Sequence, residues 1–364
     1  MHWSSAASTS HNFETALDDV ATRVEEELGG VAPQLLAIYI SSSFRESYVL
    51  VASRLRARFP GAAQIGCSAA GFIGGGRELE QTPGVSLTAA ALPGVTLHPF
   101  HVGGHALARW SEDPTTASED LRALDERLDG DIAGLILHPD PVSCDTSALL
   151  RVLDERYPGA TKIGGVASGG NRPGHNALYA GGRAHGTGVV GLAFAGALSI
   201  DSVVAQGCRP IGAPMFITRC DGNVIRELDG RSPVATVQEL YEQLEARDRV
   251  LMRNSLFIGV VTEPDASRYG PGDFLVRSII GFDPNNSALA VDAQLSTGQV
   301  VQFHLRDRQA SAQDLNAHLD ARAEALAARP PAGALLFSCL GRGKHLYGRP
   351  NHDSDALRER ARDA

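Results

Sequence analysis

One stretch of fourteen residues, 59–72, occurs a second time about a hundred residues later, at 157–170. Aligned without a gap, the two copies share Pro, Gly, Ala, Ile, Gly, Ala and Gly, which is seven of fourteen positions. In each copy a helix-like run precedes the Pro-Gly pair, and a short apolar strand and a glycine-rich loop follow it. Internal repeats constrain architecture more than any local pattern does. Because the period is far longer than that of a solenoid, the sequence predicts a duplicated half-domain.

Both halves show the same predicted order of elements. The runs at 35–40 and 132–137 are continuously apolar, which is typical of strands covered on both faces. The predicted elements are strand 35–40, helix 45–58 and strands 63–67, 85–92 and 95–102, then strand 132–137, helix 148–156 and strands 160–164, 189–194 and 198–205. A parallel β-α-β crossover places its helix over the sheet. We therefore expect an α/β fold with two β-α-β-β-β half-domains related by a pseudo-twofold axis, and a ligand crevice at their seam.

The length of 364 residues predicts about two domains. Residues 1–12 are rich in Ser, Thr and Ala, and we expect them to be disordered. The predicted N-terminal domain covers 13–207, with repeats at about 31–102 and 128–206, and includes a helix from Pro114 that carries Leu128. A smaller mixed α/β domain is predicted at 208–364. Its predicted features include a hairpin around 221–223, a helix from Pro233, a capping box at Ser311 and Asp314 before another helix, and a buried strand at 333–337.

The composition excludes several classes of protein. A net charge of −9 argues against a nucleic-acid-binding protein, which normally has a basic face. Five cysteines, an odd number without a CxxC pair, argue against a disulfide framework or a zinc ribbon and favour a reducing cytoplasm. The N-terminus has no signal-peptide pattern. The longest apolar run, 189–200, is shorter than the roughly 20 residues that cross a bilayer. We expect a cytoplasmic protein without a membrane span.

The first glycine loop, 66–71, has the spacing of a phosphate-binding loop but lacks its Lys and Ser/Thr, because Phe72 and Ile73 follow the last glycine. The dinucleotide fingerprint GxGxxG is also absent. Exposed backbone N–H groups at a strand end can still hold a carboxylate or another small anion. The alternative is a tight turn that only packs.

A third loop, 338–343, brings a thiol and an arginine to the end of a predicted strand. Arg342 offers the planar fork that suits a carboxylate or phosphate. The alternative is a solvated arginine beside a structural cysteine. Cys339, His352 and Asp353 contain the residue types of a thiolate, a base and an orienting group, although a His and an Asp adjacent in sequence rarely form such a relay.

Three histidines, His98, His101 and His105, follow one another closely. On a strand His98 and His101 point to opposite faces, which disfavours a shared metal ion. One of them could still serve as the single axial ligand of a haem. We predict no catalytic and no metal-binding residue.

Two motifs in order resemble the FIST family (F-box and intracellular signal transduction). They are Ile65-Gly-Cys-Ser-x-x-Gly71, followed by the strand from Gly84, and Leu336-Phe-Ser-Cys-x-Gly-Arg-Gly343. The resemblance covers about residues 30–353 and implies N-terminal and C-terminal FIST domains. The family's closing glycine-rich segment with a Gly-Glu pair does not follow before Ala364, which implies a shortened C-terminal domain.

The resemblance also implies a sensory module that binds small ligands such as amino acids, and some members bind haem and sense nitric oxide. No output domain is attached, so a separate signalling protein, such as a histidine kinase or a cyclase, is the expected partner. We expect a stand-alone cytoplasmic sensor of an amino acid or another small carboxylate. The alternatives are a haem-binding nitric-oxide sensor and an enzyme that uses Cys339 or Cys67. The predicted ligand-binding residues are Gly66, Cys67, Ser68, Gly71, Gly164, Ser168, Gly169, Ser338, Cys339 and Arg342.

Overall fold

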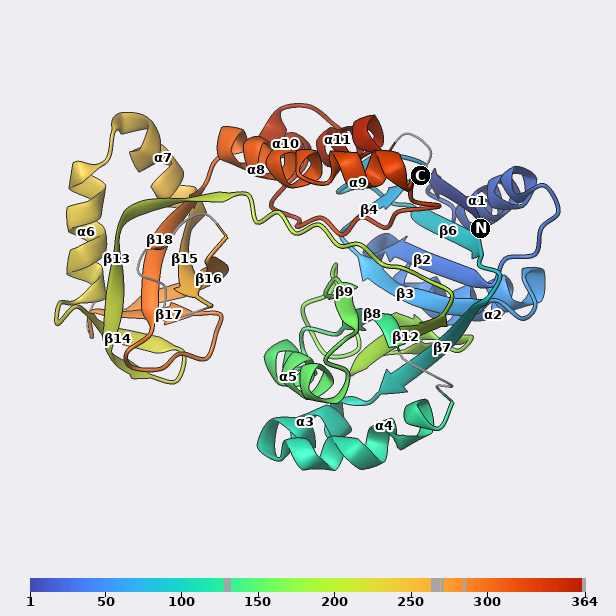
Figure 1. Ribbon diagram of the computed structural model, residues 1–364, viewed down its shortest axis with the longest axis horizontal. Helices are drawn as coiled ribbons and strands as arrows, with labels where there is room; N and C mark the ends of the chain where they lie inside the picture. Colours follow the sequence, from blue (N-terminus) through green and yellow to red (C-terminus); the bar gives the residue numbers. More distant parts are fainter. Residues whose placement is uncertain (128–131, 263–268, 270–271, 284–285, 362–364) are drawn as a thin grey trace. The chain divides into compact units, whose positions relative to one another are not determined.

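The computed structural model of the chain describes residues 1–127, 132–262, 269, 272–283 and 286–361. The chain forms two compact units (Figure 1). Unit 1 combines Met1–Ser202 with Arg322–Ala364, and unit 2 is Val203–Ala321. The predicted boundary near residue 208 is therefore close to the start of unit 2, whereas residues 322–364 of the predicted C-terminal domain group with unit 1. The last forty or so residues return to unit 1, which periodicity along the sequence could not indicate.

Unit 1 contains two sheets and a separate hairpin, β4-β5. The first sheet has the order β1-β6-β2-β3-β10-β11, and the second has the order β7-β12-β8-β9. β2 and β3 are parallel, as are β8 and β9. The strands are β1 (His2–Ser8), β2 (Leu35–Ser41), β3 (Ala63–Ala69), β4 (Gly71–Gly74), β5 (Arg77–Glu80), β6 (Val85–Ala91), β7 (Val95–Val102), β8 (Ile132–Pro139), β9 (Thr161–Gly164), β10 (Leu178–Ala180), β11 (Arg183–His185) and β12 (Val189–Gly196).

Helices cover the outer faces of both sheets, so unit 1 has four layers. Apolar side chains of α1 and α2 pack on the first sheet, and those of α3, α4 and α5 pack on the second. A third cluster, which includes Ile65 and Leu192, fills the space between the sheets. The helices are α1 (Phe13–Leu28), η1 (Ser42–Ser47), α2 (Tyr48–Arg58), α3 (Gly104–Glu112), η2 (Pro114–Thr116), α4 (Ala117–Asp125), α5 (Thr146–Arg156), α9 (Ala323–Ala328), α10 (Lys344–Tyr347) and α11 (His352–Arg360).

The two sheets share a three-strand core with the same order and direction. In the first sheet β6, β2 and β3 lie side by side, and in the second sheet β12, β8 and β9 do so. The connection within each parallel pair contains an α-helix, α2 (directly after η1) or α5, and each pair is followed by a hairpin, β4-β5 or β10-β11. The second hairpin pairs with β3 of the first sheet. The chain segments of the two halves are therefore interleaved at their seam.

Three predictions for unit 1 are wrong. Residues 2–8 are not disordered: they form β1, which pairs with β6 from His2 opposite Ala91 to Ser8 opposite Val85. An edge strand of small residues needs only half of its side chains buried, and composition does not reveal that. Strands β6 and β7 do not close one half, because they belong to different sheets. Residues 198–205 form no strand.

Two more predictions concern helices and the C-terminal segment. Helix α3 lies where no element was predicted, and the helix predicted from Pro114 begins as the short turn η2 and continues as α4, whereas Leu128 lies outside the described residues. Residues 333–337 form no strand either. Leu335 and Phe337 nevertheless pack into the cluster between the sheets, so the segment is held by its side chains rather than by a backbone ladder.

Unit 2 is a closed barrel of six strands in the order β13-β14-β17-β16-β15-β18. Its interior is apolar, with Phe303 and Ile258 fully buried. Helix α8 begins at Arg308 rather than near Ser311, because Asp307 caps its N-terminus by accepting from the amides of Gln309 and Ala310. The elements are β13 (Cys208–Asp221), β14 (Val224–Leu228), α6 (Pro233–Gln243), α7 (Ala246–Ser255), β15 (Leu256–Val261), β16 (Phe274–Asp283), β17 (Ala288–Val291), β18 (Val300–Arg306) and α8 (Arg308–Asp320). The α/β fold class is confirmed.

Candidate functional site

Gly66 and Gly164, at corresponding positions of the two repeated stretches, have the same structural role. Gly66 on β3 has φ = 151°, and a Cβ there would lie 1.8 Å from the carbonyl oxygen of Ile38 on β2. Gly164 on β9 has φ = 154°, and its Cβ would lie 1.9 Å from the carbonyl oxygen of Leu137 on β8. Only glycine adopts this backbone without strain and permits so close an approach. Both glycines are therefore required by the pairing of the parallel strands.

The loops that follow β3 and β9 meet at the seam. The backbone N–H of Ser168 donates to the carbonyl oxygen of Ser68 (3.0 Å), and the N–H of Ala70 donates to Oγ of Ser168 (3.0 Å). Gly169, with φ = 92°, lies against Ser42 at the end of β2, where an added Cβ would be 2.8 Å from the serine Cβ. The structure thus brings together Ser68, Ser168 and Gly169, which the sequence predicted to face one another.

A chain of buried hydrogen bonds extends from Ser68 into the second half. Oγ of Ser68 donates to Oδ1 of Asn176 (3.3 Å), and Nδ2 of Asn176 donates to Oδ1 of Asp140 (3.0 Å). Oγ of Ser143 donates to Oδ2 of Asp140 (2.6 Å). Ser68 and Asp140 are fully buried, and Asn176 is 2% exposed. Buried polar groups that satisfy one another in this way fix a unique arrangement. We call Ser68, Asn176, Asp140 and Ser143 the seam network.

Three aromatic rings close the seam beside this network. The Tyr39 ring on β2 meets the His138 ring on β8 edge to face at 5.4 Å, and Phe337 of the C-terminal segment contacts both. Burial lowers the pKa of His138 to about 4, partly offset by its hydrogen bond to Gly165. Burial, and secondarily Cys67, raises the pKa of Tyr39 well above its ordinary value. Both rings are therefore uncharged at neutral pH.

The cysteines predicted at the site differ in exposure. Cys67 is buried in the core between the sheets, and burial raises the pKa of its thiol to about 12. A thiol in that state is a poor nucleophile at neutral pH. Cys339 is exposed, and its Sγ accepts from the backbone N–H of Gly341 (3.3 Å). The structure therefore gives no support to Cys67 as a reactive group.

Arg342 is bound to a carboxylate of the chain itself. Its Nε and Nη2 donate to the two carboxylate oxygens of Asp353 at 2.6 and 2.9 Å, and both side chains are buried. Ser338 also donates to Asp353 (3.1 Å), and the ring of His352 stacks on Tyr347. Burial alone would raise the pKa of Asp353, but the charge and hydrogen bonds of Arg342 and the hydrogen bonds of His352 and Ser338 lower it. The guanidinium of Arg342, which was predicted to bind a ligand, thus binds Asp353 and holds the C-terminal segment together.

Gly71 lies next to this segment. A Cβ on Gly71 would be 3.3 Å from the carbonyl oxygen of Leu79 and 3.6 Å from Cδ2 of Leu340. Leu340 is 58% exposed. The first glycine loop and the third loop are therefore neighbours in space, although about 270 residues separate them in the sequence.

The histidines do not gather into a cluster of three. The rings of His101 and His185 stack at a centroid distance of 3.8 Å, and Nε2 of His101 contacts the carbonyl oxygen of Thr187. Among the residues that the structure describes, no group of three or more His, Cys, Asp or Glu side chains could hold a metal ion.

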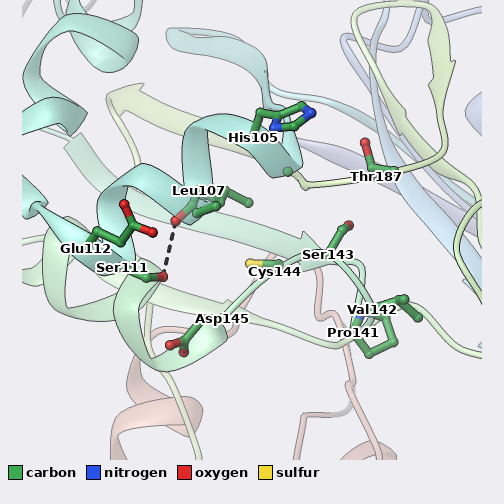
Figure 2. A pocket seen from close by; sticks show the side chains of 12 residues that line it. His105, Leu107, Ser111, Glu112, Pro141, Val142, Ser143, Cys144, Asp145 and Thr187 are labelled. Carbon is green, nitrogen blue, oxygen red and sulfur yellow. Dashed lines mark hydrogen bonds between the residues drawn. The ribbon is translucent and has the colours of Figure 1, made fainter.

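An open pocket of about 730 Å³ lies between α3 and the loop after β8. Figure 2 shows that its walls come from α3 on one side and from the segment around Cys144 on the other. Its lining residues are Gly104, His105, Leu107, Ala108, Ser111, Glu112, Pro141, Val142, Ser143, Cys144, Asp145 and Thr187. We call it the α3 pocket. Because Ser143 belongs to both, the pocket adjoins the seam network.

The chemistry of the α3 pocket is acidic and partly apolar. Glu112 and Asp145 bring two carboxylates, while Leu107, Pro141 and Val142 bring apolar surface. Oδ1 of Asp145 caps α5 by accepting from the amides of Ser147 and Ala148. Burial, and then the charges of Asp145 and Asp140, raise the pKa of the Cys144 thiol to about 12. The thiol is therefore a neutral part of the wall.

Reasoning from the sequence missed the α3 pocket. The run from Pro139 to Asp145 follows a buried strand and holds two Asp, a Ser and a Cys, which is a dense set of polar groups at a strand end. This pattern could have indicated one wall of the pocket. The opposite wall could not be expected from the sequence, because helix α3 was not predicted.

Comparisons with known proteins place the chain in a family. The sequence model of the FIST N domain matches residues 34–231, and that of the FIST C domain matches residues 236–364. The uncharacterized protein Rv0628c of Mycobacterium tuberculosis strain H37Rv is 36% identical over 355 residues, which are 97% of this chain and 88% of that protein. The uncharacterized protein Mb0898c of Mycobacterium bovis is 32% identical over 356 residues, 96% of this chain and 88% of that protein.

No helix in the described parts of the chain is long and apolar enough to cross a membrane. The two family matches cover most of the chain in the order that its two motifs predicted. The chain belongs to the FIST family, whose domains are sensory domains of signal transduction.

Proposed function

We propose that this chain is a cytoplasmic sensory module that binds a small amino acid-like ligand in the α3 pocket. The observation that carries the proposal is a pocket of about 730 Å³ with carboxylates on its walls, adjoining a buried polar network at the seam. Pockets that combine apolar walls with a few placed polar groups are the usual sites of small ligands.

The charges of the pocket favour a ligand with an ammonium group. Glu112 forms no ion pair with any other side chain in the described part of the chain. Asp145 uses Oδ1 for its capping bonds, which leaves the carboxylate charge available to a cation. Among the twelve lining residues only His105 can become positive. A cationic group therefore gains from both carboxylates, whereas a dicarboxylate is repelled.

The start of α3 supplies a place for the ligand's carboxylate. Gly104 and His105 are the first two residues of this nine-residue helix, and its N-cap Gly103 makes no side-chain capping bond. The first N–H groups of a helix have no partner within the helix and carry partial positive charge. Gly104 packs against Ser143, two residues before Asp145. An α-amino acid can thus place its carboxylate at the start of α3, beside Ser143, with Asp145 farther along the pocket on the side of Ser111 (Figure 2).

The size of the pocket favours a long, basic side chain. Gly104 and Glu112 lie at the two ends of α3. At about 1.5 Å per residue, these ends are roughly 12 Å apart. No single α-amino group reaches both ends. A lysine-like or arginine-like side chain extended over Leu107 would bring a second cation toward Glu112. Basic amino acids are therefore the proposed preferred ligands.

In this proposal the predicted loop residues do not line the α3 pocket but are connected to it by hydrogen bonds. Ser68 and Ser168 hold the two repeated loops together, and Ser68 is joined to Ser143 through Asn176 and Asp140. A ligand that moves Ser143 would change the hydrogen bonds at Ser68. Arg342 and Ser338 would take part by fixing the C-terminal segment. A separate signalling protein, such as a histidine kinase or a cyclase, would recognise the surface that ligand binding has changed.

A thermal-shift screen of the full chain against the twenty amino acids and small carboxylates tests this proposal. We expect the melting temperature to rise with lysine or arginine and to stay unchanged with glutamate. Glu112→Gln should abolish the preference for basic side chains. The matched control is Glu119→Gln on α4, which removes an exposed carboxylate outside the pocket. A screen without any shift, or equal shifts in Glu112→Gln, would contradict the proposal.

A further inference from the structure

Residues 330–338, in the C-terminal part of unit 1, belong to no helix or strand and form no backbone-to-backbone hydrogen bond with any residue that the structure describes. The run from Ala334 to Phe337 is nevertheless apolar, and Ala334 is exposed while the rest is half-buried. Leu335 and Phe337 pack into the cluster between the two sheets, which gives the alternation of inward and outward side chains that a strand has. We call residues 333–338 the unpaired segment, because it has the side-chain pattern of a strand without the hydrogen bonds.

The repeat shows where a strand is missing. Gly66 on β3 pairs with Ile38 of β2 on one side and with Tyr179 of β10 on the other. Gly164 holds the corresponding position on β9 and pairs with Leu137 of β8. Within the described parts of the chain no strand pairs with the other side of β9, so β9 ends the second sheet. A strand position that is filled in the first half thus has no backbone partner in the second.

The free side of β9 offers peptide groups for pairing. The N–H of Gly165 donates to the carbonyl oxygen of Leu137 on β8 (3.2 Å). Because successive peptide groups of a strand point to opposite sides, those of Lys162 and Gly164 face away from β8. Charged side chains often protect such an edge, but Nζ of Lys162 lies 3.0 Å from the carboxylate of Asp154 on α5. The charge of Lys162 is therefore held toward α5.

The unpaired segment lies against the end of β9 through its side chains. A Cβ on Gly165, directly after β9, would be 3.8 Å from Cδ1 of Phe337. The ring of Phe337 lies 5.7 Å from that of His138, the last residue but one of β8. Leu335 and Phe337 share their apolar cluster with Ile163 of β9. The side chains that a fifth strand would bury are thus already in place, and only the backbone bonds are missing.

We propose that the unpaired segment is a two-position switch. In the position that this structure shows, side chains alone hold the segment. In the second position its backbone pairs with Lys162 and Gly164, and it becomes a fifth strand of the second sheet. The second position satisfies peptide groups on both segments, which half-buried backbone favours. The switch needs no ligand in the α3 pocket, so it does not depend on the function proposed above.

The switch is connected to the seam at two points. Phe337 contacts the rings of Tyr39 and His138, which come from different sheets. The loop after β9 is bound to the seam network, because the N–H of Gly170 donates to Oδ1 of Asn176 (2.9 Å). The position of the unpaired segment is therefore linked to the contacts between the two halves, and it determines whether the peptide edge of β9 is covered.

Amide hydrogen exchange of the full chain, followed residue by residue by NMR at pH 7, tests the proposal. Pairing with one neighbour protects every second amide of the segment, since only those face β9. We expect alternate amides within 334–338 to exchange about tenfold slower than in an unstructured peptide, and still about a hundredfold faster than the amides of β8.

Lys162→Pro is the matching variant. It removes an outward N–H of β9 and leaves the bonds to β8, and proline is tolerated at such edge positions. The alternate protection of the unpaired segment should be lost. The control Lys162→Ala loses the same contact with Asp154 but keeps the N–H, and it should retain the protection.

The exchange pattern of the wild type decides the matter if Lys162→Pro does not fold. Exchange of all amides of the segment at the unstructured rate would overturn the proposal, as would equal protection of consecutive amides. Protection as high as that of β8 would show a permanent strand and would also overturn the switch. Alternate protection that survives in Lys162→Pro would overturn the pairing with β9.

Discussion

The hydroxyl of Tyr39 on β2 lies 3.2 Å from Nε2 of His138 on β8, at matching positions of the two sheets of unit 1. Each residue directly follows the one whose carbonyl approaches a glycine of the repeated stretch: Ile38 opposite Gly66 and Leu137 opposite Gly164. Nδ1 of His138 faces the carbonyl oxygen of Gly165 at 2.9 Å. A carbonyl can only accept, so Nδ1 carries the proton and Nε2 accepts from Tyr39. One bond between unlike residues thus joins the two halves.

Tyr39→Phe should destabilise the chain because it leaves Nε2 of His138 buried without a partner. The expected loss is about 1–3 kcal/mol of unfolding free energy. Urea unfolding at pH 7.5 measures it. An unchanged midpoint would show that the bond between the sheets contributes nothing to stability.

Acidification should weaken the fold through His138. Its pKa is lowered from 6.5 to about 4 in the folded chain, so between these values the unfolded chain binds the proton and the folded chain does not. Stability should therefore fall as pH falls from about 6.5 toward 4, by no more than about 3 kcal/mol from this residue. Comparing urea unfolding of wild type and His138→Gln at pH 7.5 and 5.0 isolates the effect. A pH dependence of equal size in the variant would rule out His138 as its source.

Glycines 66 and 164 should tolerate no side chain. In both Gly66→Ala and Gly164→Ala the new Cβ would overlap a backbone carbonyl that cannot move without breaking the parallel strand pair. Overpacking and an unfavourable φ together should cost each variant at least about 2–3 kcal/mol. The matched control is Gly61→Ala, where φ is 87° but nothing lies within 4 Å of the added Cβ, so only the backbone strain remains. Chemical denaturation of the three variants gives the comparison. Equal losses at all three positions would refute the close-approach argument.

The ion pair between Arg342 and Asp353 should behave as a buried structural pair. Arg342→Ala leaves the Asp353 carboxylate buried and uncompensated, which typically costs about 3–5 kcal/mol. Arg349→Ala is the control, because the side chain of Arg349 is 58% exposed and its contact with Asp355 is long, at 3.9 Å. Surface pairs of that kind contribute about 0–1 kcal/mol. If Arg342→Ala were no less stable than Arg349→Ala, the pair would not hold the C-terminal segment, and a role of Arg342 toward a ligand would gain support.

Iodoacetamide at pH 7.5 should label Cys339 well before Cys67. Cys339 is exposed, whereas Cys67 is buried and its pKa is raised to about 12. The thiolate is the reacting form, so burial and the raised pKa act in the same direction. Mass spectrometry of timed samples measures both rates. Labelling of Cys67, or labelling of Cys339 much faster than free cysteine, would revive the alternative of a cysteine enzyme.

The repeated stretch allowed much of unit 1 to be predicted, because continuous apolar runs and glycine spacing are local signals. The strands at 35–40 and 132–137, their connecting helices and the meeting of Ser68 with Ser168 all followed from it. The pairing of β7 with β12 and the return of Arg322–Ala364 to unit 1 did not. Both depend on packing between segments far apart in the sequence, which no local pattern records.

The candidate site was predicted less well for the same reason. Arg342 was predicted to bind an anionic group of a ligand, and the sequence could not show that its guanidinium binds Asp353, eleven residues later. The α3 pocket needs two walls, and one of them is a helix that was not predicted.

Calorimetric titration of lysine or arginine into the full chain tests the central claim most directly. Asp145→Asn is the decisive variant, since an asparagine oxygen can still cap α5 while the charge in the α3 pocket is lost. The account predicts binding to wild type and to the control Glu119→Gln, with affinity at least tenfold weaker in Asp145→Asn. Equal affinity in wild type and Asp145→Asn, or no heat of binding in any of them, would contradict it.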